Sequence, residues 1–267
     1  MAKLSISKAW DETAAFITRE TRLLVPLALA LLFLPPVIAS FVAPRATPEE
    51  LAKPGIFLVI ILVQMLIGAV GQIAISRLAL GYREQIGASL GLAARRLPAF
   101  IGSFVIVALP ILFLLGMSAG LQRAFAVQGN SSGAIVFGVL TLVFMVVMLV
   151  IFARFTLNTA IAAVEPGGPI VLAKRGFALT RGQALRLLGA ALLILIGGSI
   201  ATYALTIIVG SLVTLALGPP DPWTVSALII AVVGAAAQAA LLVVFTVLFA
   251  RLYAQRVSDL GLPSNAT

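Results

Sequence analysis

The sequence predicts an all-α fold: a polytopic membrane helical bundle of six transmembrane helices, arranged as three hairpins that each follow a basic amphipathic interfacial helix. Composition is the first reason, because 61% of the 267 residues are hydrophobic and only 10% are charged, whereas a soluble domain has about a quarter charged. The second reason is six apolar runs, each long enough to cross the ~30 Å hydrocarbon core. The third is a segregation of basic residues between alternate connections. We therefore treat residues 1–267 as a single integral membrane domain.

The six predicted spans are joined by mostly short connections. The first span resembles a signal peptide, but the preceding 22 residues include Asp11, Glu12 and Glu20, whereas a signal peptide begins with a short basic region. We therefore expect this span to be retained. The fifth run is long, so it must tilt, break or leave one end in the interface. The spans are approximately Leu23–Val42, Ile56–Ile75, Ala99–Gly120, Ala134–Leu157, Leu187–Leu217 and Thr224–Ala250.

Proline residues interrupt two of these spans. Pro26, Pro35 and Pro36 lie in the first span, and Pro110 lies in the third. Because proline lacks a backbone N–H and its ring clashes with the preceding turn, we expect kinks or helix ends at these positions. Kinked helices open cavities in some bundles and are inert in others.

The basic residues predict the orientation of the chain. The two termini, the connections 76–98 and 158–186, and Arg154 together carry 15 of the 18 Lys and Arg residues. Lys and Arg accumulate on the cytoplasmic side of membrane proteins, so both termini are predicted to be cytoplasmic. The same rule explains the net charge of +9, and we expect no nucleic-acid partner. The opposite side carries only Arg45, Lys53 and Arg123.

The sequence contains a weak threefold repeat, approximately 4–80, 88–157 and 168–254. The even-numbered spans end in "ISRLAL", "FARFTL" and "FARLYA", which place Arg77, Arg154 and Arg251 where each helix leaves the membrane. "LAARRLPAF" and "LAKRGFAL" precede the later odd-numbered spans, and a poorer match at Lys8 precedes the first. A repeating unit of basic segment, outward span, loop and inward span explains this pattern. Chance similarity in Ala- and Leu-rich sequence is the alternative.

The segments that lead into the hairpins have the pattern of interfacial helices. In 4–22, apolar residues recur every three to four positions, with charged residues on the other faces. In 170–188, an apolar set lies beside four basic residues. Such helices lie along the membrane surface, and their basic residues favour anionic lipid.

Several classes of chemistry are excluded or lack candidates. The chain has no Cys and no His, which excludes a disulfide framework, zinc sites built on Cys or His, and His-based catalysis. No Asp or Glu lies within a predicted span, so a proton relay at the midplane has no candidate. "GFALTRG" lacks the ending and the preceding strand of a nucleotide-binding loop. Only Glu84 and Glu165, near the cytoplasmic face, leave room for an enzyme; we predict no catalytic residue, metal or cofactor.

Neutral polar and small residues within the spans predict helix packing. Gln64 and Gln72 share one face of the second span, and Gln238 lies in the sixth. Each amide suits a hydrogen bond to a neighbouring helix, and substrate binding is the alternative. The fifth span has a stripe of small residues that favours close packing against Ala235 and Ala239, with a groove wall for lipid as the alternative. The stripe is Gly198, Thr202, Thr206, Gly210 and Thr214.

The stretch from "VEPGGP" (164–169) to "VLAKRGFALTRGQALRLLG" resembles a known family. It is similar to the pattern A–x–R–S–[WF]–x–L–T–[KR]–G–x–x–[WF]–x–L–L of the bacterial glycerophosphoryl diester phosphodiesterase membrane domain and related inner-membrane proteins. Gly176 replaces the usual Ser, and "QALRLL" lacks the later aromatic residue. The pattern is carried by Ala173, Arg175, Phe177, Leu179, Thr180, Arg181, Gly182, Leu187 and Leu188.

This resemblance implies a six-span module of the bacterial inner membrane. Enzymatic members of the family carry a separate barrel domain whose chemistry uses histidines and metal-binding carboxylates. The chain has no histidine, so the resemblance implies a membrane module without phosphodiesterase activity.

The predicted function is a non-enzymatic module that binds or organises anionic lipids or partner proteins at the cytoplasmic face. The alternative is an uncoupled transporter or lipid-translocating protein; a continuous polar cavity would favour it, and a sealed apolar interior would favour the module. Ordinary positive-inside charge explains the basic residues equally well. The predicted lipid-headgroup-binding residues are Lys174, Arg175, Arg181, Arg186, Arg95, Arg96, Arg77, Arg154 and Arg251.

Overall fold

The computed structural model describes residues 4–42, 55–82 and 85–260 of the chain. All the regular structure in these ranges is helical, and six helices are long and apolar enough to cross a membrane. The predicted all-α membrane protein of six spans is therefore confirmed. The predicted loop residues Arg45 and Lys53, and Glu84, lie outside the described residues.

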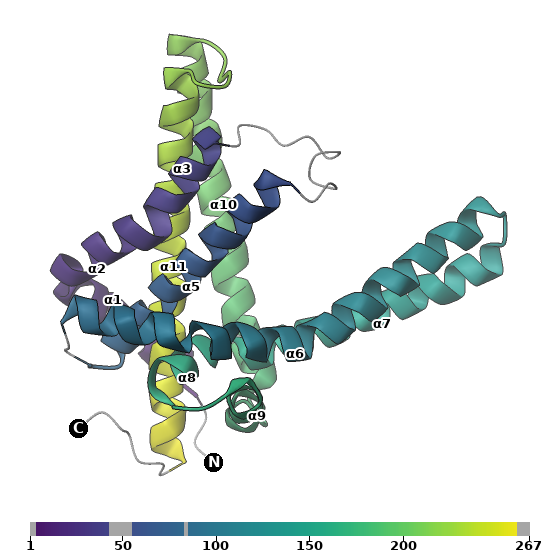
Figure 1. Ribbon diagram of the computed structural model, residues 1–267, viewed down its shortest axis with the longest axis horizontal. Coiled ribbons are helices and arrows are strands. Elements are labelled where there is room, and N and C mark those ends of the chain that lie inside the picture. Colours follow the sequence, from purple (N-terminus) through teal and green to yellow (C-terminus); the bar gives the residue numbers. More distant parts are fainter. Residues whose placement is uncertain (1–3, 43–54, 83–84, 261–267) are drawn as a thin grey trace.

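The helices form three hairpins that diverge from a common end (Figure 1). Helices α2, α3 and α5 form the first hairpin, α6 and α7 the second, and α10 and α11 the third. The α6–α7 hairpin extends away from the upright α10–α11 hairpin. The elements are α1 (Ile6–Arg19), α2 (Thr21–Ala28), the π-helical turn η1 (Leu29–Phe33), α3 (Leu34–Val42), α5 (Ile56–Ala79), α6 (Ile86–Val127), α7 (Ser131–Phe155), α8 (Asn158–Val164), α9 (Pro169–Leu179), α10 (Ala184–Leu217) and α11 (Val225–Asp259).

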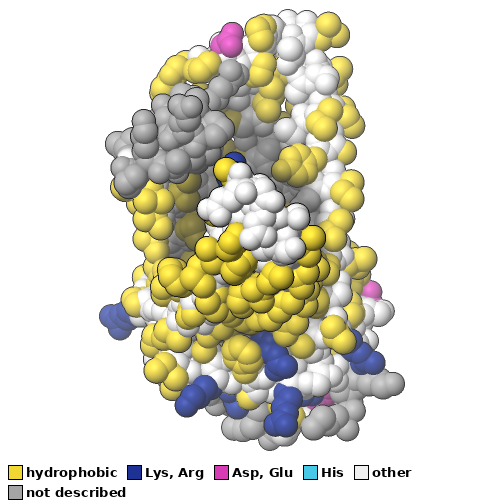
Figure 2. All heavy atoms as spheres, turned by 90° about the vertical axis from the view of Figure 1, so that its right-hand side faces the viewer, with side chains coloured by type: hydrophobic (Ala, Val, Ile, Leu, Met, Phe, Trp, Pro, Cys, Tyr) yellow, Lys and Arg dark blue, Asp and Glu magenta, His cyan; other side chains and the backbone are white. Residues whose placement is uncertain are grey.

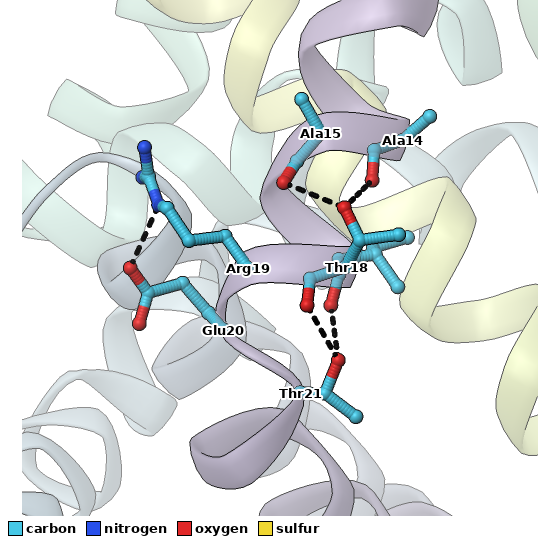
Figure 3. Close-up of polar contacts among 7 residues, drawn as sticks. Ala14, Ala15, Thr18, Arg19, Glu20 and Thr21 are labelled. Carbon is cyan, nitrogen blue, oxygen red and sulfur yellow. Dashed lines mark hydrogen bonds and ion pairs between the residues drawn. The ribbon is translucent and has the colours of Figure 1, made fainter.

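The chain bends between α1 and α2 at Glu20 (Figure 3). Thr18 Oγ1 donates hydrogen bonds to the carbonyl oxygens of Ala14 and Ala15 at 3.0 Å each. Thr21 Oγ1 donates to the carbonyl oxygen of Ile17 at 2.7 Å. The carbonyl of Ile17 belongs to the last turn of α1, where carbonyls lack helical partners, and the Thr21 hydroxyl satisfies it. The carbonyls that Thr18 contacts lie one turn earlier, inside the helix. Helix α1 and the first span can therefore meet at an angle.

The first span crosses as three connected pieces, and its prolines explain why. Pro26 lies inside α2, and Pro35 and Pro36 follow the π-helical turn. Within that turn, the N–H of Leu34 donates to the carbonyl oxygen of Leu29, five residues earlier. A widened turn relieves the clash between a proline ring and the preceding carbonyls. The expected disturbance at these prolines is thus a π-helical turn, whereas α6 continues through Pro110.

Two of the three basic leading segments are separate helices, and the middle one is not. α1 begins at a cap in which Ser5 Oγ accepts from the N–H of Lys8, and α9 is separated from α10 by a turn that contains Gly182 at φ +77°. The middle segment, with Arg95 and Arg96, is the continuous beginning of α6. Glycine adopts this left-handed conformation with little strain, and "LAARRLPAF" contains no glycine.

The buried core lies where the three hairpins meet, at the lower end in Figure 1. We call this end the base; it comprises α1, α8 and α9 with the adjoining ends of the spans. Helix α8 is its most buried element: Asn158, Ala160, Ile161, Ala162 and Ala163 are all buried. In contrast, no residue of α10 after Ile194 is buried. The distal parts of the hairpins therefore expose apolar side chains to their surroundings, as lipid-facing helices do.

Candidate functional site

The C-terminal end of α8 is buried in the base and receives two arginines. Arg77, from α5, is 6% exposed and donates from Nη1 to the carbonyl oxygen of Ala163 at 2.8 Å. Arg96, from α6, donates from Nη1 to the carbonyl oxygens of Ala162 at 2.9 Å and Glu165 at 3.3 Å. The last carbonyls of a helix lack helical partners and carry partial negative charge. The two guanidinium groups therefore satisfy this end of α8.

The C-terminal end of α9 is satisfied in the same way by two further arginines. Arg154, from α7, donates from Nη1 to the carbonyl oxygen of Phe177 at 3.2 Å and lies 5.5 Å from the centre of that ring. Arg256, from α11, is 2% exposed. It donates from Nε to the carbonyl oxygen of Leu179 at 2.9 Å and from Nη2 to that of Arg181 at 3.2 Å. Four different spans thus supply the arginines that hold α8 and α9.

Glu165 links these two short helices to α11. Its carboxylate accepts from Arg175 Nε, at 2.9 Å to Oε2 and 3.1 Å to Oε1. The hydroxyl of Tyr253 donates to Oε1 at 2.7 Å. The carboxylate is therefore fully engaged by structural partners, which argues against a free acid for catalysis.

A polar pair joins the beginning of α8 to α6. Asn158 Nδ2 donates to Ser103 Oγ at 2.9 Å, and Ser103 donates to the carbonyl oxygen of Phe100 at 2.6 Å. Directly before Ser103 in the sequence, Gly102 packs against Pro169, whose Cγ would lie 2.8 Å from an added Cβ. The close approach of α6 and α9 therefore depends on the missing side chain of Gly102.

The nine predicted headgroup-binding residues divide into two groups. Arg77, Arg96, Arg154 and Arg175 contact backbone carbonyls or Glu165, and Arg251 is partly buried with its guanidinium carbon 5.0 Å from the centre of the Phe16 ring. The other four are exposed and have no carboxylate within ion-pair distance among the described residues. They are Arg95, Lys174, Arg181 and Arg186.

The exposed basic residues gather at the base. Figure 2 shows dark blue Lys and Arg side chains around the lower end of the molecule, below a face dominated by hydrophobic side chains. We call Arg95, Lys174, Arg181 and Arg186 the basic rim. The sequence prediction of headgroup binding stays a prediction for the rim. The other five side chains already have contacts within the protein.

Sequence reasoning missed Arg256, Tyr253 and the role of Glu165. The repeat alignment selected Arg251, because it occupies the same register as Arg77 and Arg154. However, Arg256, five residues later, makes the carbonyl contacts. A weak signal existed: Tyr253 and Arg256 follow Arg251 in a segment that continues a helical pattern beyond the predicted span.

The predicted packing stripe of α10 faces α11 at several positions. An added Cβ at Gly198 would overlap the side chain of Leu241, and one at Gly210 would lie 3.8 Å from Ile230. An added Cβ at Gly234, on α11, would lie 3.8 Å from Thr206 Oγ1. The same hydroxyl donates to the carbonyl oxygen of Thr202 within α10. No side-chain hydrogen bond joins the three predicted amides to another described residue. These are Gln64, Gln72 and Gln238.

Two apolar grooves flank α11 just above α1. One, of about 300 Å³, lies between α2 and α11 and includes Leu24 and Ala239 in its walls. The other, of about 440 Å³, lies between α10 and α11, with Trp10 of α1 at one end. No charged residue lines either groove. A groove wall for lipid is the alternative role predicted from the sequence for the small residues on α10. A groove of this kind lies beside the packing stripe.

Together, the fold and the base define a multi-pass membrane helical protein. No group of three or more acidic, His or Cys side chains that could hold a metal occurs in the described part of the chain. Comparison with known proteins found no matching family model, no matching curated protein and no matching solved structure.

Proposed function

We propose that the protein is a non-enzymatic membrane module that binds and organises anionic lipids at the cytoplasmic face of a bacterial inner membrane. In this proposal the base lies at the cytoplasmic surface and both termini are cytoplasmic. The positive-inside rule supports this orientation, because the base collects most of the basic residues.

The observation that carries the proposal is the division of the basic residues. Arg77, Arg96, Arg154 and Arg256 act within the protein, where they satisfy helix ends. The basic rim, by contrast, is exposed at the same end without carboxylate partners among the described residues. Basic groups near an anionic membrane surface contribute about 1 kcal/mol each. The rim is therefore the part of the base that is available to phosphate headgroups.

We also propose membership of the glycerophosphoryl diester phosphodiesterase membrane domain family. The support is the residue pattern from Ala173 to Leu188 together with the six-span architecture. The transport alternative has less support, because charged residues are missing from the linings of the grooves beside α11.

Lipid analysis of the purified protein tests the proposed function. The variant Arg95→Ala/Lys174→Ala/Arg181→Ala removes three rim charges and should retain at least about threefold less anionic lipid than the wild type after gentle detergent extraction. Arg123→Ala removes an exposed charge at the far end of α6 and should change nothing. Unchanged anionic lipid in the triple variant would overturn the proposal. If an acidic partner protein is lost instead of lipid, the rim binds protein.

A reporter fusion tests the orientation separately. A reporter that is active only in the cytoplasm, fused after Thr267, should be active. An inactive fusion that is stably inserted would reverse the topology and place the rim on the wrong side of the membrane.

A further inference from the structure

The groove between α10 and α11 has walls made largely of small side chains. Gly197 and Ala201 line it from α10, and Ala237 and Ala240 line it from α11. Nothing lies within 4 Å of the place where a Cβ of Gly197 would stand. The volume of about 440 Å³ is thus open beside Gly197, and larger residues there would fill it.

The groove has the depth of one membrane leaflet. On α10 its lining runs from Leu193 to Leu205, and this sequence separation of twelve corresponds to about 18 Å along a helix. Half of the hydrocarbon core is about 15 Å thick. Thr202 is the one polar residue in this lining, and all the other lining residues are apolar. An extended acyl chain that lies along the helices therefore matches the groove in length and in polarity.

The end of the groove nearest the base is marked by an aromatic and a basic residue. Trp10, at this end, is 51% exposed, and an indole ring favours the level of the headgroups. Arg186 precedes Leu193 by seven residues, which is two helical turns, so both leave α10 on nearly the same face. Arg186 is exposed and has no carboxylate within ion-pair distance among the described residues. Its charge complements a lipid phosphate about 10 Å beyond the apolar lining.

We propose that this groove is a specific site for one anionic glycerophospholipid, with an acyl chain between α10 and α11 and the phosphate at Arg186. The site rests on the proposed lipid-binding function, because Arg186 belongs to the basic rim. It goes further in naming a single lipid held by its chain, where the rim alone would attract a diffuse layer of anionic lipid.

Fluorescence quenching at Trp10 tests the site directly. The chain has two tryptophans, so Trp223→Phe leaves Trp10 as the single reporter. The full chain is reconstituted in bilayers that contain a small fraction of either phosphatidylglycerol or phosphatidylcholine with brominated acyl chains. We expect phosphatidylglycerol to quench Trp10 about fivefold more effectively than phosphatidylcholine at equal fractions.

Two substitutions separate the chain contact from the charge contact. Gly197→Leu fills the groove and should abolish the selective quenching, and Ala201→Leu serves the same purpose if the first variant does not fold. Gly116→Leu is the matched control, since Gly116 is exposed on α6 with nothing within 4 Å of an added Cβ. Arg186→Ala should remove the preference for phosphatidylglycerol, whereas Arg123→Ala should keep it.

The outcomes distinguish this site from the proposed function of the rim. Equal quenching by both lipids in the wild type, or selective quenching that survives Gly197→Leu, would overturn the site. If neither lipid quenches Trp10, protein covers the groove, and this result would also overturn the proposed lipid site. The variant Arg95→Ala/Lys174→Ala/Arg181→Ala should keep selective quenching of Trp10 while it loses bulk anionic lipid. If bulk lipid is unchanged but quenching stays selective, the rim proposal fails and the groove site stands.

Discussion

The base contains a buried core crossed by arginine–carbonyl hydrogen bonds, whereas the distal halves of the hairpins have few buried side chains along their described lengths. In α6 the only buried residues after Ser103 are Ala108 and Ser118, and in α10 none follows Ile194. Helices α6 and α10 nevertheless run continuously through both regions. Their difference therefore reflects what surrounds each region.

The contrast shows where a membrane helix needs polar partners. Along the distal halves, each backbone group is satisfied within its own helix, and lipid can take the place of a core. In the base, α8 and α9 end inside the protein, where their last carbonyls would otherwise be buried without donors. The buried arginines are thus required by helix ends, and substitutions should be costly in the base and mild in the distal halves.

The largest effect is expected for Arg256→Met. Methionine has a similar length but cannot donate hydrogen bonds, so the carbonyl oxygens of Leu179 and Arg181 lose their donor. Because each buried acceptor left without a partner costs roughly 1–3 kcal/mol, we expect a loss of about 3 kcal/mol. Thermal unfolding in detergent measures it. Arg123→Met, at the distal end of α6, should leave the midpoint of thermal unfolding unchanged. Equal destabilisation by the two substitutions would contradict the proposed difference between the base and the distal halves.

A smaller loss is expected for Glu165→Gln. The amide keeps the shape of the side chain but loses the charge that Arg175 and Tyr253 contact. Hydrogen bonds to charged groups contribute about 1.5–3 kcal/mol, so we expect a loss of about 2 kcal/mol in the free energy of unfolding. A double-mutant cycle with Arg175→Gln should give a coupling energy above zero. Strict additivity would show that this ion pair does not hold α8 and α9 to each other.

Two glycines allow the regions to be compared with one chemical change. Gly102→Ala in the base would place a Cβ 2.8 Å from the rigid ring of Pro169, and we expect a loss of about 1–2 kcal/mol. At Gly197, on the distal side, nothing lies within 4 Å of an added Cβ. Gly197→Ala should therefore be neutral or stabilising by up to about 1 kcal/mol, because alanine favours the helix. Destabilisation of similar size at both sites would contradict the comparison.

Much of the distal architecture could be predicted from sequence, because a transmembrane helix is specified by one long apolar run. The span predicted as Leu187–Leu217 is part of α10. In the base, the amphipathic segment predicted within 4–22 is helix α1. The prolines predict a disturbance of the first span. That the disturbance is a π-helical turn depends on which carbonyls the backbone N–H groups near Leu29–Phe33 bond. Composition contains no signal for that choice.

The base could not be predicted to the same extent, because its contacts join residues far apart in sequence. Helix α8 has only seven residues, and "NTAIAAV" gives no indication that it is surrounded by the ends of four spans. The predicted headgroup-binding set included Arg77 together with the rim residues and did not distinguish its inward side chain from theirs. That distinction depends on which buried carbonyl lies nearby, and α8 and α9 determine this only in the folded protein.

The smallest predicted effect tests the distal region by itself. In the α6–α7 hairpin, the hydroxyl of Thr141 shares its one proton between Ser118 Oγ at 3.1 Å and the carbonyl oxygen of Phe137 at 2.8 Å, and Ser118 Oγ donates to the carbonyl oxygen of Leu115. Hydrogen bonds between membrane helices contribute about 0.6 kcal/mol on average, so Ser118→Ala should cost about that amount. Ser103→Ala in the base should cost more, because it leaves Asn158 Nδ2 buried without its acceptor. The free energies of unfolding of both variants, measured under the same conditions, test this order. If Ser118→Ala is the more destabilising, polar contacts in the distal hairpin contribute more to stability than those in the base.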